Sequence, residues 1–431
     1  MSQYTELYAA KKTTVEEALS RIPSGSVIGH SFCAGEPATL LGNLHTLQGK
    51  AKDLRVIRAL DVGQYPFAMD PQYQDTFTVD SMFFMGPDRA SHKAKQTSFI
   101  PTHLHNLSRC YDYHRPNVAL ISVTPMDEHG YLRCSLSLIS EKELVEGADL
   151  VIAEVNPNLP CVAGETEFHI SQFDAIVEAA TPIPQLPKGT VEEIDKTIGS
   201  YIASLVRDGD TLQLGIGAIP DAAAHALLGK HDLGIHTEML TTSLVDLVEA
   251  GVITGRKKTI NKGKIVGTFA LGDQRLYDMM NNNPSVALLP GSYVNDPFVV
   301  AQNDNMVSIN TCISVDLTGQ VNSESVGTLQ FSGSGGQFDT AFGAGRAKGG
   351  RSIIALHATA KKGTISTICP VLAPGAVVTL SRNNVDYIVT EFGIAPMRGR
   401  PIRERVENLI AIAHPDFRKE LRAQAEAYGI W

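Results

Sequence analysis

One glutamate and the glycine turn that precedes it are the residues of this sequence best suited to chemistry. Residues 211–214 read as a buried strand, and Gly215-Ile216-Gly217-Ala218-Ile219-Pro220 follows as a tight turn. A helix is predicted over 221–228, and residues 234–237 then lead into Glu238. A strand, a glycine turn and a helix start leave backbone N–H groups that can hold a phosphate or a developing oxyanion. A carboxylate near such a turn is placed to react with a bound electrophile.

A second glycine-rich segment strengthens this interpretation. It runs Phe331-Ser332-Gly333-Ser334-Gly335-Gly336-Gln337-Phe338-Asp339. A lone glycine-rich loop is usually only a flexible connection. Two such loops, one of them near Glu238, favour backbone recognition of an oxyanion or a thioester. Residues 343–350 are predicted as a mobile surface loop, in which Arg346 and Lys348 could meet a phosphate group.

Other motifs narrow the chemistry. The turn is not a full dinucleotide-binding GxGxxG, because Pro220 replaces the third glycine. The sequence contains neither a GxxxxGK[ST] phosphate loop nor a GxSxG nucleophile elbow. His103 and His105 form an HxH pair, but no third ligand is evident, so structural histidines are the better interpretation and no metal is expected.

Composition points to a protein that handles small molecules. The chain has 431 residues, enough for two domains, with 43% apolar and 19% charged residues. Its net charge of −9 argues against nucleic acid or an anionic membrane as the main partner. No signal peptide or membrane span is predicted. The six cysteines are scattered without CxxC spacing, which is typical of reduced thiols, and we expect a cytoplasmic location.

The two halves of the chain echo each other. Thr14-Val15-Glu16-Glu17 and Thr190-Val191-Glu192-Glu193 each predict a helix start with a threonine N-cap, followed by a strand and a glycine-containing turn. Asp127–Leu132 resembles Asp316–Val321, and the strand ending at Glu154 resembles the strand ending at Glu391. Ordered echoes of this kind indicate a duplicated domain. Strands that alternate with helices indicate mostly parallel sheets.

We therefore predict two related open α/β domains, spanning residues 1–186 and 187–431 and joined near the proline-rich stretch 181–187. The first strand of the N-terminal domain is expected over 27–30, ending at His30. Ligands in such folds bind at the carboxyl ends of the strands, so we expect the active site in the cleft between the domains.

Seven segments together resemble one family. They are GHSFCAGEP (29–37), TPMDEHG (124–130), VNPNLP (155–160), GIGAIP (215–220), GIHTEM (234–239), SGSGGQFD (332–339) and EFGIAPMRGR (391–400). In this order and over nearly the whole chain, they resemble the acetyl-CoA hydrolase/transferase group of class I coenzyme A (CoA) transferases. The resemblance is greatest to the 4-hydroxybutyrate and butyryl-CoA:acetate CoA-transferases. It implies the CoA-transferase-like fold.

The resemblance also implies roles for single residues. Glu238, carried by the C-terminal domain, would be the nucleophile, and the backbone N–H groups of Ile216 and Gly336 would be oxyanion donors. Further substrate or CoA contacts would involve these residues: Gly215, Gly217, Asn295, Gly335, Gln337 and Glu391. Structural roles stay open for Asn295, which lies in a turn, and for Glu391, whose echo is Glu154. His30 could touch substrate or serve as a core histidine. Arg398 and Arg400 could instead pair with acids such as Glu404.

The expected chemistry is ping-pong transfer of CoA from a short-chain acyl-CoA to a carboxylate such as acetate, through a glutamyl-CoA thioester. It needs no metal or redox cofactor, because the CoA thioester is itself the substrate. The alternatives are an acyl-CoA hydrolase on the same scaffold and a non-catalytic acyl-CoA or sugar-phosphate sensor. A homo-oligomer, a dimer or larger, is expected. The acyl chain is not decided by these motifs.

Overall fold

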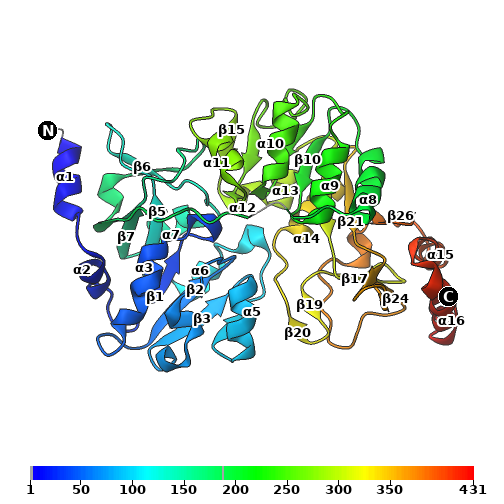
Figure 1. Ribbon diagram of the computed structural model, residues 1–431, viewed down its shortest axis with the longest axis horizontal. Coiled ribbons are helices and arrows are strands. Elements are labelled where there is room, and N and C mark those ends of the chain that lie inside the picture. The colour runs from blue at the N-terminus through cyan, green and yellow to red at the C-terminus, as the bar shows by residue number, and fades with distance from the viewer. Residues whose placement is uncertain (1–2, 187–188) are drawn as a thin grey trace. The chain divides into compact units, whose positions relative to one another are not determined.

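The chain forms two compact units, shown in Figure 1. The structure, a computed structural model, describes residues 3–186 and 189–431. Unit 1 contains residues 1–187 and 266–294, and unit 2 contains 188–265 and 295–431. The boundary predicted after residue 186 falls at residues 187 and 188, which lie outside the described residues.

The sequence analysis placed residues 266–294 in the second domain, but they group with unit 1. They are attached there by backbone hydrogen bonds, including Leu138 N–H to Thr268 O at 2.8 Å and Ala270 N–H to Leu136 O at 2.9 Å. No local sequence pattern predicts such pairing between distant segments.

Unit 1 is built on a seven-stranded sheet whose order is β4-β3-β2-β1-β5-β7-β9. Its pairings are all parallel. The strands are β1 (Val27–His30), β2 (Leu54–Arg58), β3 (Phe77–Ser81), β4 (Thr97–Phe99), β5 (Val118–Val123), β7 (Leu150–Val155) and β9 (Ala175–Glu178). The helices of residues 3–186 are α1 (Gln3–Lys11), α2 (Val15–Ser20), α3 (Ala38–Asn43), α4 (Pro66–Met69), α5 (Gly86–Lys93), α6 (Cys110–His114) and α7 (Glu141–Gly147).

The same unit carries shorter elements. They are the antiparallel pair β6 (Tyr131–Arg133) and β8 (Glu167–His169) and, in or bordering the returning segment, β13 (Ile265–Gly267), β14 (Phe269–Ala270), α11 (Gln274–Met280), β15 (Val286–Leu288) and α12 (Gly291–Val294). The core of unit 1 packs α2 and α3 against the sheet through Leu19, Leu40 and Ile28.

Unit 2 contains six consecutive strands in the order β11-β10-β16-β21-β25-β26. All neighbours are parallel except the last pair. The strands are β10 (Thr211–Leu214), β11 (Gly234–His236), β16 (Met306–Thr311), β21 (Arg351–Ala355), β25 (Tyr387–Thr390) and β26 (Gly393–Pro396). The helices are α8 (Glu193–Ser204), α9 (Ala218–Ala226), α10 (Thr242–Glu249), α13 (Pro297–Val300), α14 (Gln337–Arg346), α15 (Ile402–Ile412) and α16 (Pro415–Ala427).

Short strands complete unit 2. They are β12 (Met239–Leu240), β17 (Ser314–Asp316), β18 (Val321–Asn322), β19 (Ser325–Val326), β20 (Leu329–Gln330), β22 (Thr359–Ala360), β23 (Ile365–Ser366) and β24 (Ile368–Cys369). The two C-terminal helices, red in Figure 1, close one core through Leu409 and Leu421. The predicted fold class, open α/β with mostly parallel sheets, is confirmed.

The two units repeat one strand order. In unit 1 the strand order β2-β1-β5-β7-β9 matches the order β11-β10-β16-β21-β25 in unit 2. In both units the second of these strands, β1 or β10, comes first in the chain; the next strand in sequence lies on one side of it, and a later strand, β5 or β16, lies on the other. Detail repeats as well. One carboxylate oxygen of Asp127 accepts from the N–H groups of residues 129 and 131, and one of Asp316 accepts from those of residues 318 and 320. Ordered repetition of this kind supports a duplicated α/β domain.

Local predictions were partly right. The strands over 27–30 and 211–214 and the Thr14 N-cap are confirmed. The second predicted cap was wrong: α8 begins at Glu193, with Glu192 at the N-cap and its N–H held by Asp195. The predicted loop over 343–350 was wrong for residues 343–346, which belong to α14, whereas residues 347–350 do connect α14 to β21 without a helix or strand.

Candidate active site

Glu238 lies just beyond the carboxyl end of β11, on the side of the unit 2 sheet where its parallel strands end. Strand β10 pairs with β11 on one side and with β16 on the other, all in parallel. The carboxyl ends of the three strands therefore share an edge, at the point where the strand order reverses. A hydrogen bond of 3.3 Å from Thr237 Oγ1 to Leu214 O joins the residue before Glu238 to the residue before the glycine turn.

Two donors face the Glu238 carboxylate. Asn295 Nδ2 donates to Glu238 Oε2 at 2.9 Å, and the Gly336 backbone N–H donates to the same carboxylate. A Cβ atom on Gly336 would lie 1.9 Å from Glu238 Oε2 and 2.1 Å from Asn295 Nδ2. Only glycine therefore fits at position 336 while both partners keep their places.

Helix packing brings Asn295 to this point. Asn295 is fully buried and lies immediately before α13, whose N-terminus is capped by Asp296 Oδ1 accepting from Phe298 N–H at 2.7 Å. Helix α13 packs closely on α14, since a Cβ atom on Gly343 would approach Val300 Cβ to 2.6 Å. Gly336 is the N-cap of α14. The close helix pair thus fixes an amide side chain and a helix N-terminus on one carboxylate.

The surroundings set the charge state of Glu238. Burial raises its pKa from 4.5 to about 7, and the negative charge of Asp339 also raises it. The hydrogen bonds from Asn295 and Gly336 lower the pKa, because they favour the ionised form. A carboxylate with a pKa near neutrality, held only by N–H donors, is more basic than an ordinary glutamate yet still ionised above pH 7.

The glycine turn reaches solvent beside this edge. Gly215 N–H donates to Ile309 O at 3.0 Å, so its amide holds the turn to β16. Gly217 has a φ of +110°, which favours glycine, and the side chain of Ile216 is 46% exposed. Helix α9 starts directly after the turn, three residues earlier than predicted, with Pro220 inside its first turn. The turn therefore presents exposed backbone at a helix N-terminus.

Other predicted residues have different partners. Both ends of the Gln337 side chain are engaged, with Ser323 Oγ at 2.5 Å from Oε1 and Nε2 donating to Thr311 O at 2.7 Å. The carboxylate of Glu391 accepts from Ala358 N–H at 2.9 Å. Gly335, with a φ of +51°, shapes the loop. The structure therefore brings Glu238, Asn295 and Gly336 into contact, whereas the recorded side-chain bonds of Gln337 and Glu391 go elsewhere.

His30 belongs to a different environment in unit 1. It is fully buried, with Nδ1 at 2.8 Å from Ser31 O and Nε2 at 3.6 Å from Asp61 Oδ2. Burial lowers its pKa, which favours the neutral imidazole. These contacts are those of a core histidine.

Three groups near Glu238 were not anticipated from the sequence. Asp339 raises its pKa, Thr340 bonds the Gly336 carbonyl, and Lys258 bonds strand β11 through Ile235 O at 2.7 Å. For Asp339 and Thr340, polar residues of α14 that are buried, the available signal was a polar side chain in a buried element; Lys258 lies in a loop and has no such signal. Such residues need internal partners, which often lie at functional sites.

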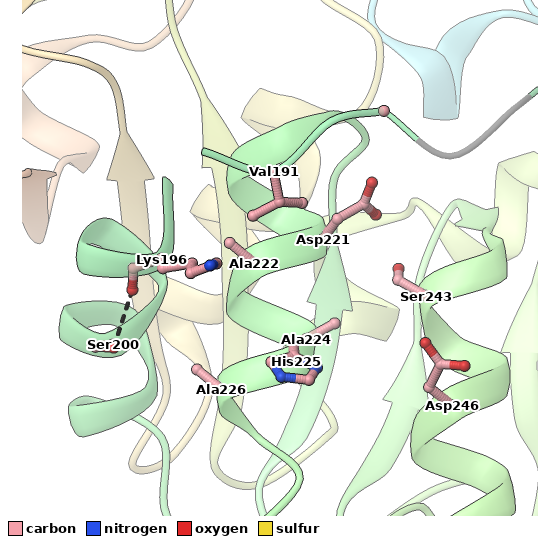
Figure 2. Close-up of a pocket in the computed structure, with 11 residues that line it drawn as sticks. Val191, Lys196, Ser200, Asp221, Ala222, Ala224, His225, Ala226, Ser243 and Asp246 are labelled. Carbon is pink, nitrogen blue, oxygen red and sulfur yellow. Dashed lines mark hydrogen bonds between the residues drawn. The ribbon is translucent and has the colours of Figure 1, made fainter. Parts of the chain in front are cut away.

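A separate cavity of about 470 Å³ lies among helices α8, α9 and α10 (Figure 2). Figure 2 shows Lys196 and Ser200 on α8, Asp221 and His225 on α9, and Asp246 on α10. Its lining does not include Glu238, Asn295 or Gly336. We therefore build the candidate reaction site on the Glu238 contacts and not on this cavity.

The described part of the chain offers few other kinds of site. Within residues 3–186 and 189–431, no three or more His, Cys, Asp or Glu side chains gather in a way that could hold a metal ion. In the same described ranges, no helix combines the length and apolar character needed to cross a membrane. All six cysteines are free thiols. Arg400 does pair with Glu404, at 3.1 Å, and Arg398 pairs with Asp386.

The fold and the Glu238 arrangement define an α/β protein with a carboxylate held by N–H donors. Comparisons with known proteins identify the family to which such a chain belongs. Residues 1–187 match the acetyl-CoA hydrolase/transferase N-terminal domain, and residues 272–425 match the C-terminal domain. The chain is 43% identical to a 4-hydroxybutyrate coenzyme A transferase of Clostridium kluyveri, covering 97% of this chain and 98% of that one.

Two further similarities are as extensive. A succinyl-CoA:cyclohexane-1-carboxylate CoA transferase of Geobacter metallireducens is 42% identical, over 98% of this chain and 96% of that one. The crystal structure of RipA from Yersinia pestis superposes with a TM-score of 0.95 at 38% identity, covering 100% of both chains. The chain therefore belongs to the acetyl-CoA hydrolase/transferase family and is an enzyme with CoA-transferase activity.

Proposed function

We propose that this enzyme moves CoA from a short-chain acyl-CoA, of the 4-hydroxybutyryl or butyryl type, to a carboxylate such as acetate through a glutamyl-CoA thioester on Glu238. The observation that carries the proposal is the Glu238 carboxylate itself. It is held by Asn295 Nδ2 at 2.9 Å and by the Gly336 N–H, with no room for a side chain at position 336.

The proposed reaction moves CoA by four additions to carbonyl carbons. A Glu238 oxygen attacks the carbonyl carbon of the acyl thioester and the C–S bond breaks. This step releases CoA thiolate and forms a mixed anhydride between Glu238 and the acyl group. The thiolate then attacks the glutamyl carbonyl and releases the first acid as its carboxylate. The incoming carboxylate reverses these steps, so Glu238 is regenerated and a new acyl-CoA is released. No net proton transfer occurs, and the two-stage route predicts ping-pong kinetics.

The backbone donors suit the charge that develops in these steps. Each addition places negative charge on a carbonyl oxygen, and fixed N–H groups stabilise it without reorganisation. Gly336 N–H and Asn295 Nδ2 already donate to Glu238, so they are placed for an oxyanion formed on the glutamyl carbon. The backbone N–H of Ile216, in the exposed turn shaped by Gly215 and Gly217, is proposed for the oxyanion of the acyl group.

The remaining proposals concern contacts and cofactors. We propose that Gly335 and the backbone of Gln337 line the path of the CoA thiol. Glu391 is proposed to support the segment that lines this path. No metal or redox cofactor takes part, because carboxylates and thiolates supply every bond that forms. The enzyme is proposed to act as a homo-oligomer.

The runner-up is an acyl-CoA hydrolase, which would share every step up to the glutamyl thioester and then admit water. The description of the family covers both activities. A non-catalytic sensor would require that Glu238 have no chemical task, which its two donors and pKa of about 7 argue against.

Butyryl-CoA incubated with and without acetate separates these activities. We expect acetyl-CoA to form only when acetate is present, with no net release of free thiol. Steady thiol release independent of acetate would establish the hydrolase instead. Glu238→Gln should abolish nearly all turnover, whereas Glu249→Gln at the end of α10 should retain it. CoA exchange that persists in the Glu238→Gln variant would contradict a glutamyl-CoA intermediate on Glu238.

A further inference from the structure

A buried polar network connects the two glycine loops of unit 2. Gln213 lies in β10, Ser308 and Asn310 lie in β16, and Thr340 lies in the first turns of α14. Each of these four side chains is at most 9% exposed. Gln213 and Ser308 are direct partners in the parallel register, and Asn310 follows on the same face.

The hydrogen bonds of the network are closely spaced. Ser308 Oγ lies 2.9 Å from Gln213 Oε1 and 2.9 Å from Thr340 Oγ1. Asn310 Nδ2 donates to Gln213 Oε1 at 3.1 Å and lies 3.3 Å from Thr340 Oγ1. Thr340 Oγ1 in turn donates to Gly336 O at 3.0 Å. The chain of contacts thus runs from the strand before the Gly215 turn to the residue whose N–H meets Glu238.

The location is unusual for polar side chains. Parallel strands covered on both faces are normally apolar throughout. The opposite face of these strands follows that rule, with Leu212, Leu214, Val307 and Ile309 all at most 2% exposed. Burying amides and hydroxyls is tolerated only when they are bonded, and a bonded network makes the local geometry rigid.

The backbone at Gly335 and Gly336 must be held in place by neighbouring groups, because glycine itself restricts the backbone little. Gly335 and Gly336 have no side chain that could restrict the backbone, so the direction of the Gly336 N–H must be set by other groups. The carbonyl of Gly336 accepts from the Thr340 backbone N–H at 2.9 Å and also from the Thr340 hydroxyl at 3.0 Å. The Gln337 side chain donates to Thr311 O at 2.7 Å and so holds the next residue. Both side-chain contacts anchor the loop to β16 or to residues bonded to it.

We infer that Thr340, backed by Ser308, Asn310 and Gln213, is the positioning residue that aims the Gly336 N–H at Glu238 and keeps it in register with the β10 turn. The inference rests on the proposed function, in which that N–H stabilises the glutamyl oxyanion. Thr340 does not touch substrate and acts only through Gly336.

Thr340→Val tests this with little change of shape, since it replaces the hydroxyl by a methyl group. We expect kcat to fall about 10-fold to 100-fold, because a misaimed oxyanion donor costs that order. KM for the acyl-CoA should change less than about twofold. Thr340→Ser, which keeps the hydroxyl, should restore the wild-type rate.

The pKa of Glu238 gives a readout that does not depend on turnover. It can be measured by ¹³C NMR of glutamate-labelled protein, with the Glu238 signal assigned from Glu238→Gln. Because the Gly336 N–H lowers this pKa, Thr340→Val should raise it above its value of about 7. Thr197→Val is the matched control, since it removes a similar hydroxyl-to-carbonyl bond of 2.9 Å on the exposed side of α8 and should leave the pKa unchanged.

Three results would overturn the inference: an unchanged Glu238 pKa in Thr340→Val, an unchanged kcat, or a Thr340→Ser variant as impaired as Thr340→Val. If Thr340→Val does not fold, Ser308→Ala decides in its place, with a smaller rise in the pKa as the expected result and no rise as the contrary one. If the wild type lacks CoA transfer, the proposed function fails, but the pKa comparison still tests the positioning role.

Discussion

Glu238 is balanced between reactivity and ionisation. Desolvation raises its pKa to about 7, which makes the carboxylate a stronger base than an exposed glutamate, while Asn295 and Gly336 favour the charged form. Attack on a thioester requires that charged form. The site therefore holds a carboxylate that is more basic than an exposed glutamate and ionises near neutral pH.

This balance predicts a pH profile. Because the ionised Glu238 is the proposed nucleophile, kcat/KM should rise with pH through an apparent pKa of about 7 and level off above it. Asp339→Asn removes a negative charge that raises the pKa, so the rise should move to lower pH. Initial rates between about pH 5.5 and 8.5 would show both effects.

The exposed aspartate Asp75 of unit 1 supplies the control for that profile. Asp75→Asn removes the same charge elsewhere and should leave the profile in place. A wild-type kcat/KM that is flat between about pH 6 and 8 would contradict the assignment of Glu238 as a nucleophile with a raised pKa.

At the scale of elements, a buried lysine is hydrogen-bonded to the backbone of strand β11. Lys258 is fully buried, and its Nζ donates to Ile235 O at 2.7 Å and to Lys264 O at 2.9 Å. Its stem crosses Gly234, where a Cβ atom would lie 2.4 Å from Lys258 Cγ. Burial lowers the pKa of Lys258 from 10.5 to about 7, since the ammonium is removed from water.

The lowered pKa of Lys258 predicts a pH-dependent stability. Between pH 7 and 10.5 the unfolded chain binds a proton at Lys258 that the folded chain does not, so this lysine makes stability rise with pH in that window. Below pH 7 both states are protonated and the full penalty applies. Lys258→Met removes this dependence, at up to about 1.4 kcal/mol per pH unit.

Denaturant unfolding of wild type and Lys258→Met at about pH 7, 8 and 9 measures the effect. The free energy of unfolding of the wild type should gain on that of the variant as the pH rises. Lys257→Met, at the exposed neighbouring position, should run parallel to the wild type. A constant difference between wild type and Lys258→Met would show that Lys258 keeps its proton throughout this range.

At the scale of the whole molecule, one fold is used twice, and the acids at corresponding strand ends have different partners. In unit 1 the acid after β2 is Asp61, which is fully buried and lies 2.7 Å from Arg58 Nε. In unit 2 the acid after β11 is Glu238, which meets N–H donors of an amide and the backbone. A guanidinium pairs with the first carboxylate, whereas the second accepts hydrogen bonds from neutral N–H donors, as the proposed nucleophilic role requires.

The chain should therefore carry a single reactive carboxylate. Intact-mass measurement after incubation with acyl-CoA, in the absence of an acceptor acid, should show one covalently attached CoA per chain. Peptide mapping should place it on Glu238, and Glu238→Gln should show none. Attachment at Asp61, or two CoA groups per chain, would contradict the division of roles between the units.

Local features were readable from the sequence because they depend on neighbours in the chain. Glycines beside short strand-like runs, Gly25 before β1 and Gly215 after β10, gave both strands at their observed bounds, and Thr14 caps α2 as its position predicts. Helix α14 was missed because glycines at 343 and 345 argue against a helix. In the structure, Gly343 is there to let α13 approach.

The sequence by itself determined the repeated order of strands and helices, the glycine turn after β10 and the carboxylate after β11. Only the tertiary structure decided which groups meet that carboxylate. Asn295 and Gly336 reach Glu238 because α13 packs closely against Gly343 of α14 and because buried hydroxyls and amides hold the loop. Such contacts join residues far apart in the chain, and their geometry follows from packing, which local periodicity does not encode.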